Sequence, residues 1–124
     1  MNEPMEERRV SRDSMVTELI PAIGYIRVNT ARVFTDSEGQ RKSIEQWAQR
    51  SGHLVVDWVE DILVSGEAGR NDLALEELLS RVQKGVAAVV AVDAAYRISR
   101  RVEAYRRWNE RLVAAGGQLK WALD

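Results

Sequence analysis

Four arginines stand next to the ends of apolar runs in this sequence. They are Arg27, Arg70, Arg97 and Arg100. The planar guanidinium group presents a fork of N–H donors that matches the oxygens of a phosphate group. The carboxylates expected nearby are Glu60, Asp61 and Asp93. If the fold gathers the four arginines at one place, the resulting site is suited to binding an anion, and phosphate in particular.

Composition excludes several other chemistries. The chain of 124 residues has no cysteine, which removes thiol catalysis and thiolate metal sites. Its single histidine, His53, cannot form a multi-histidine metal site within one chain. Neither a G-x-G-x-x-G pattern nor a P-loop is present, so a nucleotide-binding α/β domain is disfavoured. We therefore expect no metal and no cofactor.

The net charge of −1 is not that of a globally basic nucleic-acid binder, but the charge is unevenly distributed. Residues 97–111 carry six arginines against Glu103 and Glu110. Such a stripe can bind phosphate, or it can be a solvated helix face with charge pairs three or four residues apart. The first residues lack the apolar core of a signal peptide, and no apolar run reaches the roughly 18 residues of a membrane span. We expect a cytoplasmic protein that does not insert into a membrane.

The apolar pattern predicts the elements that position these residues. Strands are predicted at 22–28, 53–60, 86–92 and 118–123, and helices at 38–51, 72–84 and 98–115. Strands that alternate with helices indicate right-handed βαβ units. The fold class is therefore α/β, a three-layer sandwich with a mainly parallel sheet of four to five strands. The nearly continuous apolar run 86–92 is typical of a central strand covered on both faces.

Side-chain periodicity also predicts part of the core. The last helix is expected to bury the stripe Ile98, Val102, Tyr105, Asn109, Leu112 and Val113. The four tryptophans are scattered over helices and strands, so they are expected to pack in the core or at its rim rather than to form a stacking platform.

Ligands of open α/β sheets bind at the carboxyl ends of the strands. Here the first strand ends in residues 25–30, the loop after the second holds residues 60–66 followed by Arg70, and residues 96–100 follow the third. Arginines from three separate loops are thus expected to converge on one end of the sheet.

In order and spacing, these segments resemble the motifs of serine recombinases of the resolvase/invertase family. That family carries Y-x-R-V-S-T, then S-L-x-x-Q, then E-D-x-x-x-S-G with an arginine soon after, and finally D-R-L-S-R. This chain has YIRVNT at 25–30, DSEGQ at 36–40, EDILVSG at 60–66 with Arg70, and YRISR at 96–100. The resemblance covers about four fifths of the chain and implies a resolvase-like catalytic domain over residues 22–124.

In that family the serine attacks a DNA phosphodiester and forms a 5′-phosphoserine link, while arginines stabilise the charged transition state. The resemblance places Asn29 at the nucleophile position. It also assigns phosphate or DNA binding to five residues. These are Arg27, Gln40, Arg70, Arg97 and Arg100.

The chain departs from the family pattern in four respects. An amide at Asn29 has no ionisable hydroxyl, and the neighbouring Thr30 is expected to point elsewhere because adjacent strand residues face opposite sides. Tyr96 replaces an aspartate of the active-site charge network, and Val33 replaces a loop glutamine. The sequence stops at Asp124, without the family's long dimerisation helix and DNA-binding region.

These observations lead to one expectation and two alternatives. The expected protein is a catalytically inactive, recombinase-like domain that associates with itself or with an active recombinase and retains weak phosphate or DNA binding. The alternatives are an active DNA recombinase core that uses another nucleophile, and a non-functional remnant of a mobile element. Residues 1–21 are expected to be an N-terminal extension, either flexible or a short helix.

Overall fold

A computed structural model describes residues 18–29, 33–63 and 72–123 of the chain. The strands are β1 (Ile20–Asn29), β2 (His53–Leu63), β3 (Val89–Val92) and β4 (Gln118–Trp121). The helices are α2 (Val33–Ser51), α3 (Asp72–Gln83) and α4 (Val102–Ala114), with a short 3₁₀ turn, η2 (Ala95–Arg97), after β3.

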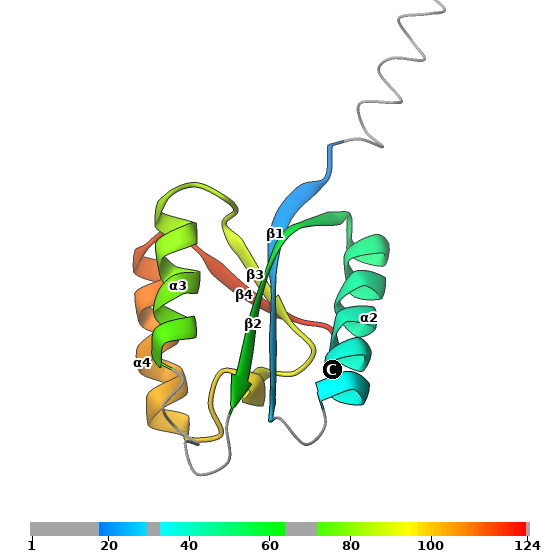
Figure 1. Ribbon diagram of the computed structural model, residues 1–124. Helices are drawn as coiled ribbons and strands as arrows, with labels where there is room; N and C mark the ends of the chain where they lie inside the picture. Colours follow the sequence, from blue (N-terminus) through cyan, green and yellow to red (C-terminus); the bar gives the residue numbers. More distant parts are fainter. Residues whose placement is uncertain (1–17, 30–32, 64–71, 124) are drawn as a thin grey trace, which may run out of the picture.

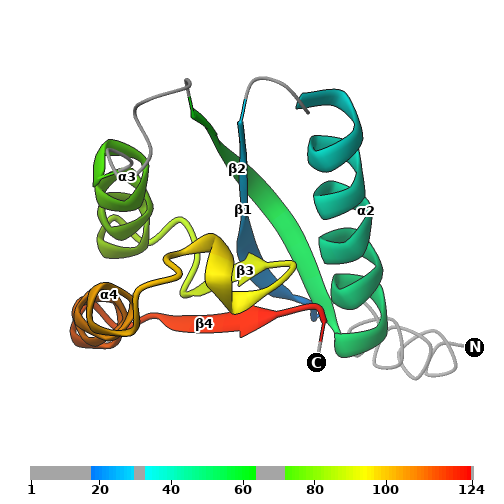
Figure 2. The same ribbon diagram turned by 90° about the horizontal axis from the view of Figure 1, so that it is seen from below.

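The strands form one parallel sheet in the order β2-β1-β3-β4. Helix α2 covers one face of the sheet, and α3 and α4 cover the other (Figures 1 and 2). This arrangement confirms the predicted three-layer α/β sandwich with a parallel sheet.

Each face of the sheet has its own core. Between the sheet and α3 and α4 lie large side chains, among them Ile23, Tyr25 and Leu112. The opposite core, under α2, combines the small residues Ala22 and Ala91 with Ile44 and Trp47 and their neighbours. All four residues of β3 are buried, as predicted for a central strand.

The tryptophans belong to these layers, as the sequence predicted. Trp47 and Trp108 are buried in the two cores. Trp58 is partly buried against the α2 core, and the exposed Trp121 lies at the rim.

One close contact fixes how β1 and β2 lie together. Gly24 of β1 is paired with Trp58 of β2, and a Cβ atom at Gly24 would lie only 2.3 Å from Cζ3 of the indole. The guanidinium carbon of Arg41, from α2, lies 4.4 Å from the centre of the indole ring, and Arg41 also pairs with Glu60. A glycine is needed at position 24 because the indole occupies the space of a side chain.

Several element boundaries differ from the predicted ones. Helix α2 begins at Val33 rather than at 38, and its first turn contains Asp36, which the sequence placed in a polar loop. Acidic residues are favourable in a first helical turn, where N–H groups are free, so polarity alone did not mark a loop here. Strand β2 continues to Leu63 instead of ending at 60, and β3 is limited to 89–92 instead of 86–92.

The predicted stripe of the last helix was partly wrong. Helix α4 begins at Val102, and the side chains of Val102 and Val113 are 76% and 60% exposed. Its buried residues are Trp108 and Leu112. Ile98 is fully buried but precedes the helix. Tyr105 and Leu112 of the predicted stripe do pack in the core, so the prediction fails at Val102 and Val113, near the two ends of the helix.

The contact between Gly24 and Trp58 makes a prediction about stability. Gly24→Ala should lower the free energy of unfolding by about 1–3 kcal/mol, because the indole must move out of a packed core. Urea denaturation followed by circular dichroism measures this change. Gly39→Ala in α2 is the control, because its Cβ meets nothing within 4 Å and should stabilise the helix by about 0.5–1 kcal/mol. Equal stabilisation by both substitutions would contradict the packing described here.

Candidate phosphate-binding site

The carboxyl end of β1 has a strand on one side only. β1 pairs with β2 along its whole length, up to Asn29 opposite Leu63. Its pairing with β3, however, covers only Ala22–Gly24. Beyond Gly24, backbone groups on the β3 side need other partners, because buried N–H and C=O groups are costly when unpaired.

Gln40 of α2 supplies these partners at Arg27. Its Oε1 accepts a hydrogen bond from the Arg27 backbone N–H, and its Nε2 donates one to the Arg27 carbonyl oxygen, each with an N···O distance of 3.0 Å. The Gln40 side chain is almost fully buried. The amide thus takes the place of a neighbouring strand and fixes the backbone two residues before Asn29.

The Arg27 side chain connects β1 to the turn that follows β3. Its Nη1 donates to the carbonyl oxygens of Arg97 and Ile98, at 3.2 Å and 3.1 Å. In return, Arg97 Nη1 lies 3.3 Å from the Arg27 carbonyl oxygen, to which it donates. These contacts hold the ends of two strands at the same edge of the sheet.

Arg97 is paired with a buried carboxylate. Its Nε and Nη2 donate to the two oxygens of Asp93 at 2.8 Å and 3.1 Å, a bidentate geometry. Burial acts to lower the pKa of Arg97, but the hydrogen bonds and charge of Asp93 outweigh burial and raise that pKa above its ordinary value. Arg97 therefore stays cationic, and Asp93 neutralises most of its charge.

A second carboxylate lies on the other side of Arg27. The Tyr25 hydroxyl donates to Asp61 Oδ2 at 3.0 Å. Burial raises the pKa of Asp61, while the Tyr25 hydrogen bond and the charge of Arg27 partly oppose that effect. The Asp61 carboxyl group thus lies within the field of the Arg27 charge, which favours its ionised form against the effect of burial.

Arg100 differs from these two arginines. Its guanidinium carbon lies 4.4 Å from the centre of the Tyr96 ring, and that of Arg97 lies 4.9 Å from the same ring. Within residues 18–29, 33–63 and 72–123, Arg100 has no carboxylate partner. Among the described arginines of this edge, Arg100 is therefore neither paired with a carboxylate nor hydrogen-bonded to a backbone carbonyl.

The structure brings together most of the predicted site residues. Arg27, Gln40 and Arg97 are in direct contact, and Arg100 is next to Arg97 across the Tyr96 ring. Asn29 is the last residue of β1, although its side chain, like the whole of Arg70, lies outside what the structure describes. Phosphate binding by the predicted residues remains a prediction.

The sequence placed Asp93 near the arginines but did not predict that it pairs with one of them. The spacing of four residues between Asp93 and Arg97 was the available signal, since oppositely charged residues at that spacing often pair. The contact of Arg41 with Trp58 and Glu60 had no such signal, because those residues come together only through the pairing of the strands.

Two searches of the described residues bear on other kinds of site. Over those residues, no group of three or more His, Asp or Glu side chains could hold a metal ion. None of the helices in the described part of the chain has the length and apolar character needed to cross a membrane.

Comparison with known proteins shows which family the chain belongs to. The model of the resolvase N-terminal domain matches residues 22–122, so the chain belongs to the resolvase family of serine recombinase catalytic domains. A search of the curated proteins gives no match.

Two solved structures share the fold. The C-terminal catalytic domain of ISC1926 TnpA, an IS607-like serine recombinase, matches with a TM-score of 0.70 and 24% identity, over 85% of this chain and 69% of that one. The N-terminal catalytic domain of TP901-1 integrase matches with a TM-score of 0.67 and 21% identity, over 82% of this chain and 76% of that one. The predicted resolvase-like fold is confirmed.

The two hydrogen bonds of Gln40 can be tested separately from function. Gln40→Leu should cost about 1–3 kcal/mol of unfolding free energy, because it leaves the Arg27 N–H unpaired and leaves the Arg27 carbonyl oxygen with Arg97 alone. It should also speed hydrogen exchange of the Arg27 amide, measured by NMR. Gln46→Leu, at an exposed position of the same helix, should change stability by less than about 0.5 kcal/mol. Unchanged protection of the Arg27 amide would contradict the role given to Gln40.

Proposed function

We propose that this domain has the serine recombinase fold but does not cleave DNA. The observation that carries the proposal is Asn29 at the carboxyl end of β1, two residues after the backbone of Arg27 that Gln40 holds. The family motif has its serine at this position. A carboxamide has no hydroxyl to lose a proton and cannot form a phosphoester with DNA, so the covalent step has no nucleophile.

The neighbourhood of Tyr96 supports the same proposal. In the family pattern an aspartate stands at this position, whereas here an aromatic ring lies against two guanidinium groups. Loss of that carboxylate changes the charge balance around the arginines, which in the family stabilise a charged transition state.

We further propose that the domain acts by associating with a second copy or with an active recombinase. Three exposed aliphatic side chains of the edge strand β2 support this: Leu54, Val56 and Ile62 are 53%, 48% and 45% exposed. An edge strand has unpaired backbone groups along one side, and exposed apolar side chains on it favour contact with another chain.

Weak phosphate or DNA binding is the remaining part of the proposal. Among the described arginines, Asp93 neutralises much of the charge of Arg97, and Arg27 uses Nη1 on backbone carbonyl oxygens, so Arg100 has the most N–H groups free for an anion. Fewer available cations mean fewer counterions released on DNA binding, and therefore lower affinity.

A supercoiled plasmid provides the test of inactivity. The unmodified protein should give neither nicked plasmid nor a covalent protein–DNA adduct on a denaturing gel. Asn29→Ser combined with Tyr96→Asp should form an adduct, because it restores both the hydroxyl and the carboxylate of the family pattern. Asn29→Ala with Tyr96→Asp is the matched control and should form none. An adduct formed by the unmodified protein would show that another residue acts as nucleophile.

Association can be measured by light scattering. The protein should have the mass of a dimer at micromolar concentration, and Val56→Lys should shift it toward the monomer because a charge is then placed on the exposed edge strand β2. Val113→Lys is the control, since Val113 is equally apolar and 60% exposed but lies on α4. A strict monomer at all concentrations would count against self-association, and an equal effect of both variants against β2 as the interface.

A further inference from the structure

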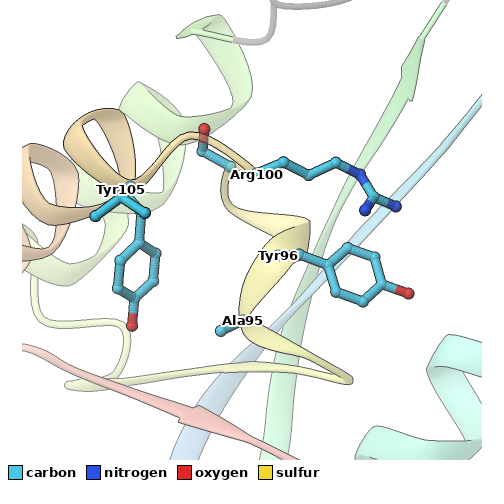
Figure 3. Close-up of a pocket in the computed structure, with 6 residues that line it drawn as sticks. Ala95, Tyr96, Arg100 and Tyr105 are labelled. Atoms are coloured by element: carbon cyan, nitrogen blue, oxygen red, sulfur yellow. The ribbon is translucent and has the colours of Figure 1, made fainter.

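A pocket of about 310 Å³ opens between the turn η2 and the start of α4 (Figure 3). It is lined by Ala95, Tyr96, Ser99, Arg100, Val102 and Tyr105, and we refer to it as the Tyr96 pocket. In Figure 3 the two tyrosine rings lie on either side of Ala95, and the Arg100 side chain extends over the Tyr96 ring. The volume is at the lower end of the range for small-ligand sites, and it would hold a single planar group.

The lining of the Tyr96 pocket combines aromatic surface with positive charge. Tyr96 is 42% exposed, and the guanidinium groups of Arg97 and Arg100 lie over its ring, so a base stacked on the ring would take the place of the Arg100 guanidinium. Tyr105 and the largely exposed Val102 add apolar surface. Aromatic rings with adjacent arginines are the means by which proteins bind nucleobases and their phosphates together.

The charges around the pocket favour an anionic ligand. Of the described carboxylates around the pocket, Asp93 pairs with Arg97, and Glu103 pairs with Arg106 and Arg107 at 2.7 Å and 3.9 Å, while the charge of Asp36 also acts on Arg97. Arg100 and the exposed Arg101 have no carboxylate partner in the described part of the chain. The rim therefore has a net positive charge that a phosphate can neutralise.

The identity of residue 96 decides whether a base can stack here. An aspartate, as in the family pattern, would offer no ring. Tyrosine at this position offers a ring that any base can stack on, because stacking requires only a π face.

We propose that the Tyr96 pocket binds one unpaired nucleotide of single-stranded DNA, with the base on the Tyr96 ring and the adjacent phosphate at Arg100. This inference rests on the phosphate-binding part of the proposed function and specifies its ligand. It does not depend on whether position 29 can attack DNA.

Fluorescence anisotropy with a labelled oligothymidylate of about ten nucleotides tests the stacking contact. The unmodified protein should bind this probe more tightly than an abasic strand of the same length or a duplex. Tyr96→Ala should weaken binding of oligothymidylate roughly 5- to 150-fold, the effect of losing one base–aromatic stack, and should abolish the preference over the abasic strand. Tyr96→Phe keeps the ring and should bind as the unmodified protein does.

The phosphate contact has its own variant and control. Arg100→Gln should weaken binding of both the oligothymidylate and the abasic strand, and should reduce the slope of log affinity against log salt by about 0.7. Arg107→Gln removes the same charge from an exposed position of α4 and should leave the affinity nearly unchanged. Circular dichroism of each variant checks that the fold is intact.

The outcomes separate this inference from the proposed function. If Tyr96→Ala binds like the unmodified protein, or if both strands bind equally, base stacking is wrong. Loss of affinity in Arg100→Gln alone would then leave phosphate binding standing. Failure of the unmodified protein to bind any strand would overturn the inference and the phosphate-binding part together, whereas the adduct experiment decides on cleavage independently.

Discussion

Beyond Gly24 the backbone of β1 has one strand beside it instead of two, because its pairing with β3 ends there. β1 nevertheless continues to Asn29, at the edge of the sheet where the site lies. Side chains support it there: Gln40 pairs with the Arg27 backbone from α2, and Arg27 in turn holds the carbonyl groups after β3. The two Gln40 bonds replace backbone partners that a longer β3 would have provided, and the Arg27 side chain ties the end of β1 to the turn after β3.

The same hydrogen bonds set the electrostatics of the edge. A guanidinium that donates to backbone oxygens or to a buried carboxylate has fewer N–H groups and less charge left for a ligand. Arg27 and Arg97 are of this kind, whereas Arg100 contacts an aromatic ring and keeps its charge. Counting arginines in the sequence therefore overstates the attraction of this site for anions, and it does not show where the attraction is concentrated.

The sequence was a good guide to features that depend on periodicity and a poor one to features that depend on pairing. Apolar runs such as 86–92 identified the central strand, and motif order placed Arg27, Gln40 and Arg97 together. The residues that Gln40 contacts were not predictable in this way, because the gap it fills exists only once β1 and β3 diverge. The start of α4 and the exposure of Val102 were missed for a related reason: the 3₁₀ turn before the helix, which no periodicity marks, sets where it begins.

Arg27 and Arg97 hold the ends of β1 and β3 together, and this role limits which substitutions the chain can tolerate. Replacing Arg97 would leave Asp93 as an unpaired charge in a buried position, which typically costs about 3–5 kcal/mol. Replacing Arg27 would free two carbonyl groups at once. Selection for a folded protein would therefore be sufficient to preserve both arginines in a domain that did not cleave DNA. The presence of Arg27 and Arg97 is then a consequence of folding and not by itself a sign of catalysis.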